Sequence, residues 1–151
     1  MTTLHTLGFP RIGAQRELKQ AQEAFWRGES SVEALHTTAR QLRQRHWLLQ
    51  KGAGIERIAV GDFTLYDHVL DHQVLFGALP ARFGLDVANL STEDYFALAR
   101  GNAQQPALEM TKWFDTNYHY LVPEFDCQTV FQLQPTTLFN QLSEAQALGI
   151  P

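Results

Sequence analysis

The stretch Ile55-Glu-Arg-Ile-Ala-Val-Gly-Asp-Phe-Thr-Leu-Tyr-Asp-His-Val-Leu70 says most about the fold of this chain. Its beginning is short and rich in β-branched residues, which predicts a buried strand over residues 55–60. A polar turn follows, and the chain then leads into a predicted helix that ends near Phe76. A buried strand that passes through a polar turn into a helix is the repeating unit of parallel α/β folds.

The same alternation extends along the rest of the chain. Strands are predicted at residues 6–9 and 118–122, with a short extra strand at 131–134. Further helices are predicted at residues 16–26, 31–51, 91–100 and 135–148. Capping boxes are predicted at two of these helix starts, formed by Ser30 with Glu33 and by Ser91 with Asp94. The order predicts an α/β fold, a partial (β/α)8 TIM barrel of about three βα units with parallel strands and covering helices.

Composition narrows the classes of protein. The 151 residues fit one domain, and a net charge of −4 excludes a general attraction to nucleic acid or to an anionic membrane surface. No apolar run approaches the ~18 residues of a membrane-spanning helix, and the N-terminus lacks the pattern of a signal peptide. Cys127 is the single cysteine, so no internal disulfide can form. We expect a cytoplasmic protein.

Two basic residues stand at the start of the first predicted helix. Arg16 and Lys19 are three residues apart, so they share a helix face, and Arg11 lies in the preceding loop. The start of a helix also offers free amides and the positive end of its dipole. These groups can bind an anion that carries several carboxylates, although a solvated basic face would have the same pattern.

A lysine also stands among aromatic residues in the stretch from Glu109 to Glu124. Lys112 can reach a pocket while its aliphatic stem packs on Trp113, or it can be an ordinary surface lysine. The aromatic side chains around it can stack on a flat heterocycle or belong to the core. They are Trp113, Phe114, Tyr118 and Tyr120.

Polar residues follow the predicted strand at 55–60. Asp62, Tyr66, Asp67 and His68 are placed for ligand contact at the carboxyl end of a barrel strand, or the aspartates cap the next helix. His68 and His72 are four residues apart, a spacing that suits a metal pair, but the pattern offers no third ligand. We therefore expect no metal site in this chain.

Several blocks of this sequence resemble the cobalamin-independent methionine synthase family. They are Gly8-Phe-Pro-Arg-Ile-Gly13, Arg16-Glu-Leu-Lys19, His46-Trp47, Val60-Gly-Asp-Phe63, Tyr66-Asp-His-Val-Leu70 and Glu109-Met-Thr-Lys-Trp-Phe114. The resemblance implies an enzyme of two (β/α)8 barrels that moves a methyl group from 5-methyltetrahydropteroyltri-L-glutamate to L-homocysteine. It implies that residues 1–151 are an N-terminal fragment of the folate-binding barrel.

The resemblance also implies roles for particular residues. Arg16, Glu17, Leu18 and Lys19, together with Lys112, are expected to contact the folate, and no catalytic or metal-binding residue is expected in this chain. The family uses zinc and no cobalamin, with zinc ligands and the homocysteine site in a C-terminal barrel absent here. We therefore expect this chain to be inactive alone.

Two further expectations follow. A partial barrel leaves open sheet edges and an uncovered apolar face, which predicts self-association. The alternative to a piece of the methyltransferase is a short, non-enzymatic module that binds folate polyglutamates.

Overall fold

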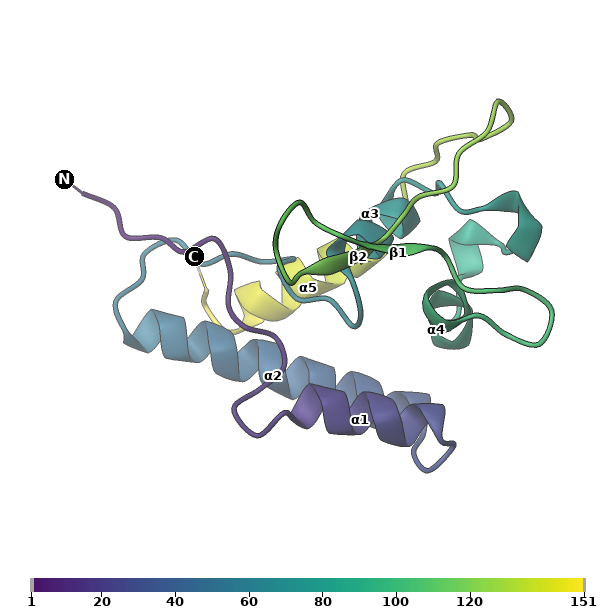
Figure 1. Cartoon of the computed structure of the whole chain (residues 1–151). Coiled ribbons are helices and arrows are strands. Elements are labelled where there is room, and N and C mark those ends of the chain that lie inside the picture. Colours follow the sequence, from purple (N-terminus) through teal and green to yellow (C-terminus); the bar gives the residue numbers. More distant parts are fainter. Residues whose placement is uncertain (1, 151) are drawn as a thin grey trace. The chain divides into compact units, whose positions relative to one another are not determined.

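The structure, a computed structural model, describes residues 2–150, and these form two compact units. The first unit is the chain up to Leu65 together with the segment from Thr136, and the second is Tyr66–Pro135. Figure 1 shows their elements. The first unit contains the helices α1 (Glu17–Trp26), α2 (Val32–Gly52) and α5 (Thr136–Ala147). The second contains α3 (His68–Leu75), η1 (Ala81–Phe83), η2 (Val87–Asn89), α4 (Thr92–Arg100), β1 (Met110–Lys112) and β2 (His119–Leu121).

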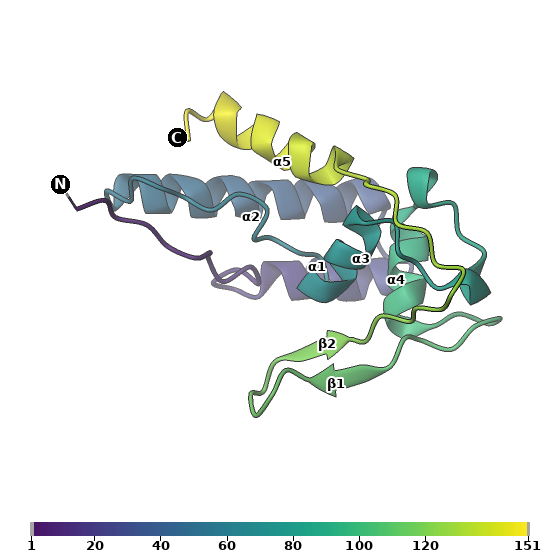
Figure 2. The same cartoon turned by 90° about the horizontal axis from the view of Figure 1, so that it is seen from above.

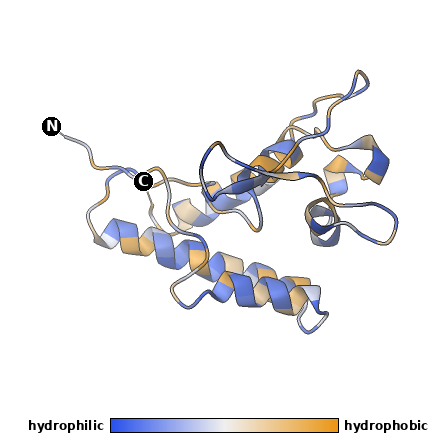
Figure 3. Cartoon of the chain, viewed as in Figure 1, coloured by the Kyte–Doolittle hydropathy of each residue, from blue (hydrophilic) through white to orange (hydrophobic). Residues whose placement is uncertain are grey.

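In the first unit, α2 contacts both other helices and lies between them (Figure 2). Apolar and polar residues alternate along α1 and α2 at helical spacing, as the banding in Figure 3 shows. The apolar side chains Leu18 of α1 and Leu35 and Leu42 of α2 are almost fully buried. Burying a leucine stabilises the fold by about 1.5–3 kcal/mol, so these residues hold the two helices together.

The observed N-caps of α2 and α4 can be compared with the two predicted capping boxes. The box formed by Ser91 and Asp94 at the start of α4 is confirmed. The box at Ser30 is wrong by one residue, because α2 begins at Val32 and Ser31 is the extended residue before it, with φ −82° and ψ 164°. The Ser31 hydroxyl accepts a hydrogen bond from the Ala34 amide at 3.2 Å.

The segment 55–60 lies in the first unit but does not form the predicted strand, and Ile58 is its one buried residue. Ile58 packs in a core cluster with Trp47, Ala145 and Ile150. The strand at 6–9 is also wrong: His5 and Arg57 make an isolated parallel bridge only. Beyond that bridge the chain bonds to side chains instead of to a neighbouring strand. The Thr6 hydroxyl donates to the side chain of Gln50, and the Phe9 amide donates to Asp62.

In the second unit, the strand predicted at 118–122 is confirmed as β2, but its predicted parallel pairing is wrong. It pairs antiparallel with β1 in the register Met110–Leu121, Thr111–Tyr120 and Lys112–His119. The physical reason is the short connection between the strands. A parallel pair needs a crossover of a dozen or more residues, whereas these strands are joined by residues 113–118.

The extra strand predicted at 131–134 is wrong as well. The amides of Gln132 and Gln134 donate to the carbonyls of Phe76 and Leu75 at the end of α3, at 2.8 and 2.7 Å. A loop held on a helix end has no strand beside it with which to form a ladder. Residues 2–150 thus combine helices with a small antiparallel sheet of two strands.

The apolar face of α5 is only partly covered. Ala145 of α5 is buried, but Leu138 and Leu142 are 39% and 41% exposed, and their neighbour Phe139 is 59% exposed. Exposure of such large apolar side chains to water is unfavourable, and their burial would stabilise the protein.

Among the described residues, no helix combines the length and the apolar character needed to cross a membrane.

Candidate functional site

The chain turns sharply just before α1 begins. Gly13 has φ +86°, and its carbonyl accepts a hydrogen bond from the Arg16 amide at 3.0 Å. Arg16 is the N-cap of α1 and has the left-handed conformation φ 61°, ψ 32°, which is uncommon for a residue with a side chain. Backbone outliers of this kind cluster at ligand-binding positions, so the start of α1 is a candidate site.

The four predicted contact residues at this helix start divide into two pairs. Arg16 and Lys19 are exposed to solvent, whereas Leu18 is fully buried and Glu17 is half-buried. The carboxylate of Glu17 accepts the Gln15 amide and pairs with Arg45, both at 2.9 Å. Glu17 and Leu18 therefore hold the turn in place, and the two basic side chains face outward.

The charged groups at this helix start differ in the same way: Glu17 is engaged within the protein, and the basic side chains are not held tightly. Hydrogen bonds from its own backbone amide and from Arg45 keep the pKa of Glu17 below its ordinary value of 4.5. Glu17 is thus ionised at neutral pH and already paired. Lys19 makes a looser, exposed ion pair with Glu23 at 3.4 Å, and the structure shows no ion pair from Arg16 to any of residues 2–150. Such exposed pairs are weak and exchange readily with a ligand.

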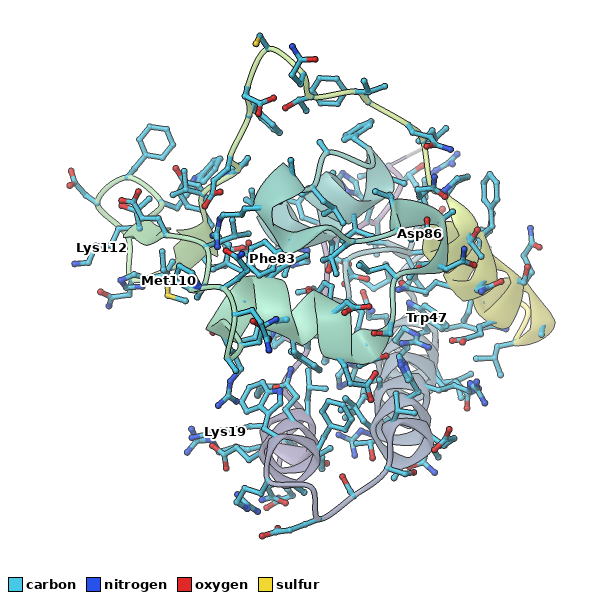
Figure 4. The ribbon with its side chains drawn as sticks, turned by 90° about the vertical axis from the view of Figure 1, so that its right-hand side faces the viewer. Lys19, Trp47, Phe83, Asp86, Met110 and Lys112 are labelled. Atoms are coloured by element: carbon cyan, nitrogen blue, oxygen red, sulfur yellow. The ribbon has the colours of Figure 1, made fainter. Side chains whose placement is uncertain are left out.

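The other predicted contact residue, Lys112, lies in the second unit at the end of β1. Its side chain is exposed and extends away from the hairpin (Figure 4). Lys112 is the last residue of β1 and Trp113 begins the turn, so packing of the lysine stem on Trp113 stays a prediction. Trp113 packs against Phe114 and Tyr120, with ring centroids 5.3 and 5.5 Å away.

The aromatic residues of this hairpin do not belong to the core. Trp113 is 46%, Phe114 81% and Tyr118 40% exposed. Their exposure rules out the core interpretation for these three side chains, while stacking on a heterocycle stays a prediction.

The aspartates after residue 60 have structural partners. Asp67 is the N-cap of α3, where its side chain accepts the Leu70 amide at 3.0 Å, so the capping alternative is confirmed for Asp67. Asp62 does not cap a helix; it accepts the Phe9 amide at 2.8 Å. His72 hydrogen-bonds through Nδ1 to the His68 carbonyl at 2.7 Å, which occupies one of its ring nitrogens.

Metal binding can be tested on the described part of the chain. Among residues 2–150, no three histidine, cysteine, aspartate or glutamate side chains are grouped so that they could hold a metal ion. Zinc centres in proteins use three or four such ligands. The described residues therefore do not fit a zinc centre by themselves.

A small cavity in the first unit lies beside Phe9, His46 and Asp62. Its volume of about 10 Å³ is room for about one water molecule, far too little for a folate. The rings of Phe9 and His46 lie 4.5 Å apart. Burial, with a smaller effect from the charge of Arg45, lowers the pKa of His46 below its ordinary value of 6.5. His46 is thus a neutral packing partner at neutral pH.

Comparison with known proteins identifies the family. Residues 3–151 match the family model described as "Cobalamin-independent synthase, N-terminal domain". Proteins named 5-methyltetrahydropteroyltriglutamate–homocysteine methyltransferase are 58% identical over 149 residues in Nitrosomonas europaea, and 59% identical over 149 in Actinobacillus pleuropneumoniae serotype 5b. The corresponding protein of Neisseria meningitidis serogroup C is 59% identical over 150 residues.

Each of these alignments covers 99% of this chain but only 20% of the relative. The chain thus spans about one fifth of the length of the curated relatives that it matches. Since the family model matches nearly every residue, and the relatives agree with it, the chain belongs to the cobalamin-independent synthase family, where it matches the N-terminal domain.

Proposed function

We propose that this chain is part of a cytoplasmic methyltransferase that moves a methyl group from 5-methyltetrahydropteroyltri-L-glutamate to L-homocysteine, giving methionine. The observation that carries the proposal is the identity of 58–59% to proteins of that name across 99% of the chain. The description of the family as cobalamin-independent supports a transfer that uses no cobalamin.

The share of this chain in that activity is the binding of the polyglutamate tail. Arg16 and Lys19 supply positive charge at the start of α1, where free amides also favour an anion. Lys112 supplies a third cation from the hairpin. Glu17 and Leu18, whose side chains are already engaged, contribute by holding the helix start and through their backbone. The tail carries several carboxylates, so its contacts with these side chains are charge-assisted hydrogen bonds.

The test is a calorimetric titration of the chain with methyltetrahydropteroyltriglutamate, beside the double variant Arg16→Gln/Lys19→Gln. Each lost contact is worth about 1 kcal/mol, or roughly fivefold in affinity, so the double variant should bind more than tenfold more weakly. Added salt should weaken binding by the native chain. Arg27→Gln is the control, because it removes one charge from the other end of α1.

Unchanged affinity in the double variant would contradict the assignment of Arg16 and Lys19. Absence of binding by the native chain at millimolar triglutamate would contradict the proposal that this chain holds a tail site by itself.

We further propose that, in the longer protein, residues 6–9 and 55–60 are neighbouring parallel strands of the N-terminal (β/α)8 barrel. Two observations support this proposal. His5 and Arg57 already form a parallel bridge, and Ile58 is buried as an inner strand residue would be. Backbone hydrogen exchange of residues 55–60 should therefore be slower in the longer protein than in this chain.

The zinc that the family requires is proposed to lie in the C-terminal barrel of the parent enzyme, outside this chain. We therefore expect the chain alone to transfer no methyl group from methyltetrahydropteroyltriglutamate to homocysteine. The measurement is methionine formation by the purified chain with and without added zinc. Zinc-dependent turnover would contradict this part of the proposal.

We also propose that the chain associates with itself through the uncovered face of α5. Leu138, Phe139 and Leu142 form an exposed apolar stripe there, and such a stripe favours burial against a second copy. Light scattering should show a dimer or a larger species at high concentration, and Phe139→Ser should shift it toward monomer. A native chain that stays monomeric would contradict this proposal.

A further inference from the structure

One buried carboxylate, that of Asp67, joins helix α3 to strand β2 of the hairpin. Asp67 is only 3% exposed. Its Oδ2 accepts the Leu70 amide of α3 at 3.0 Å and the Leu121 amide of β2 at 3.2 Å. Its Oδ1 accepts a hydrogen bond from the Tyr118 hydroxyl. Both oxygens are therefore used, one of them by the helix and the strand together. We name Asp67, Tyr118 and Leu121 the Asp67 latch.

The Asp67 latch lies at the outer edge of β2, the edge that does not pair with β1. The amide of Val122 donates to the carbonyl of Glu109. Hydrogen-bonded pairs alternate along an antiparallel ladder, so the backbone amide and carbonyl of the preceding residue, Leu121, point away from β1. The Leu121 amide meets Asp67, and its carbonyl accepts the side-chain amide of Gln73 at 3.2 Å. Side chains of α3 and its cap thus satisfy the outer edge of β2 at its most buried residue.

The hairpin itself is short. Each strand has three residues, and an isolated two-stranded hairpin is marginally stable at best in water. The latch makes contact at Tyr118 and Leu121, which enclose His119 and Tyr120, and His119 is the cross-strand partner of Lys112. The two points that fix β2 on α3 therefore bracket the position opposite Lys112.

We propose that Asp67 is a positioning residue for ligand binding: through Tyr118 and Leu121 it fixes the hairpin so that the Lys112 ammonium meets a carboxylate of the polyglutamate tail. This inference rests on the proposed function. Loss of the latch lets the hairpin fray, so Lys112 must be ordered when the ligand binds, and that ordering weakens affinity.

The test uses Tyr118→Phe, which removes one donor, and Asp67→Asn, which keeps a side chain suited to the N-cap. Tyr95→Phe is the matched control, since it removes a tyrosine hydroxyl that donates to Asp71 at 2.6 Å in the same unit and leaves the latch intact. Two quantities are measured for each variant. They are the affinity for methyltetrahydropteroyltriglutamate and, without ligand, the exchange rate of the Leu121 amide.

We expect both latch variants to exchange the Leu121 amide at least tenfold faster and to bind the triglutamate several-fold more weakly, with Tyr95→Phe unchanged in both. In a Lys112→Ala background, Tyr118→Phe should weaken binding no further, because the side chain that it positions has been removed. That non-additivity is the mark of positioning, since a general loss of structure would weaken binding in either background.

Each other outcome overturns a defined part of the inference. Unchanged Leu121 exchange in both variants overturns the latch, whatever the ligand does. Faster exchange with unchanged affinity, or an equal loss of affinity in the Lys112→Ala background, overturns the positioning role. Absence of triglutamate binding by the native chain overturns the proposed tail site in this chain, and the positioning role with it. The exchange measurement, which needs no ligand, then still decides whether the latch itself exists.

Discussion

The start of α1 and the β1–β2 hairpin each expose basic side chains, but different forces hold them in place. The helix start rests on Leu18, which is fully buried in the core that α1 shares with α2. The hairpin rests on Leu121 and on hydrogen bonds to one carboxylate, Asp67. Apolar burial is spread over many contacts, whereas the polar anchorage of the hairpin depends on a few atoms.

This difference predicts two kinds of motion. A region held by a shared apolar core opens only when the whole unit unfolds, whereas a region held by a few hydrogen bonds can open locally at lower cost. The basic side chains of α1 are thus held by a helix packed in an apolar core. Lys112 is held by a hairpin whose position a single substitution can make more mobile. Substitutions in each region can test whether the two supports differ in this way.

The largest effect is expected from Leu18→Ala. Removing a fully buried leucine leaves a cavity between α1 and α2 and should lower the free energy of unfolding by about 2–5 kcal/mol, measured by urea denaturation. The control is Leu49→Ala on α2, where the side chain is 58% exposed and the loss should be about 0.5 kcal/mol or less. Equal losses in the two variants would show that α1 is not held by its core.

A glycine pair tests the second unit against the first. Gly77 and Gly28 have similar positive φ angles, 63° and 72°, so alanine at either costs about 1 kcal/mol in backbone strain. A Cβ at Gly77 would also lie 2.5 Å from the Gln132 carbonyl oxygen, whereas one at Gly28 would meet nothing within 4 Å. Gly77→Ala should therefore lower the melting temperature clearly more than Gly28→Ala, and it should speed exchange of the Gln132 amide.

The sequence was informative about helices because their signals are local. Periodic apolar residues, capping residues and terminal glycines lie within a few positions of the element that they define, and the helices were predicted near their observed bounds. Even the error at Ser30 is an error of one residue, since two adjacent serines can each cap a helix. Leu18, for example, is one of the periodic apolar residues of α1, and the structure buries it.

Strands were predicted less well because a strand needs a partner that local pattern does not specify. Residues 6–9 and 55–60 have the right composition, but beyond the bridge between His5 and Arg57 the Phe9 amide bonds to the Asp62 side chain instead of to a strand. The antiparallel pairing of β2 depended on recognising β1 as a strand only a short turn away. Likewise, apolar spacing on α5 could not say whether another element covers Leu138 and Leu142.

For the candidate site, sequence pattern identified residues but not their surroundings. Arg16 and Lys19 are exposed as a binding role requires, and Lys112 is too, but the roles themselves stay predictions. Asp67 was predicted either to contact a ligand or to cap a helix, and its bonds to the hairpin were not predicted. Its bonds to Tyr118 and Leu121 span more than 50 residues of sequence, and no local signal reports them.

A moderate effect is expected from pH, through His46 in the first unit. Its pKa is lowered in the folded state, chiefly by burial, so the unfolded chain binds the proton more readily. The contribution of neutral His46 to stability is therefore complete above pH 6.5 and is lost as pH falls below it, with a slope of at most ~1.4 kcal/mol per pH unit. Urea midpoints measured at several pH values should show this loss. His46→Gln should flatten the profile there.

The smallest effect is expected from Glu23→Gln, which frees Lys19 of its ion pair. The pair is exposed and spans one helical turn, so its removal should change stability by only about 0.3–0.5 kcal/mol. In the native chain, Lys19 must break its ion pair with Glu23 before it can bind a ligand carboxylate. The variant does not lose that free energy on binding, so its affinity for the triglutamate should rise about twofold. Glu29→Gln, which breaks the Arg27 pair beyond the far end of α1, should leave affinity unchanged. If Glu23→Gln left affinity unchanged or lowered it, Lys19 would not exchange partners, and the firm support of α1 would present Arg16 alone.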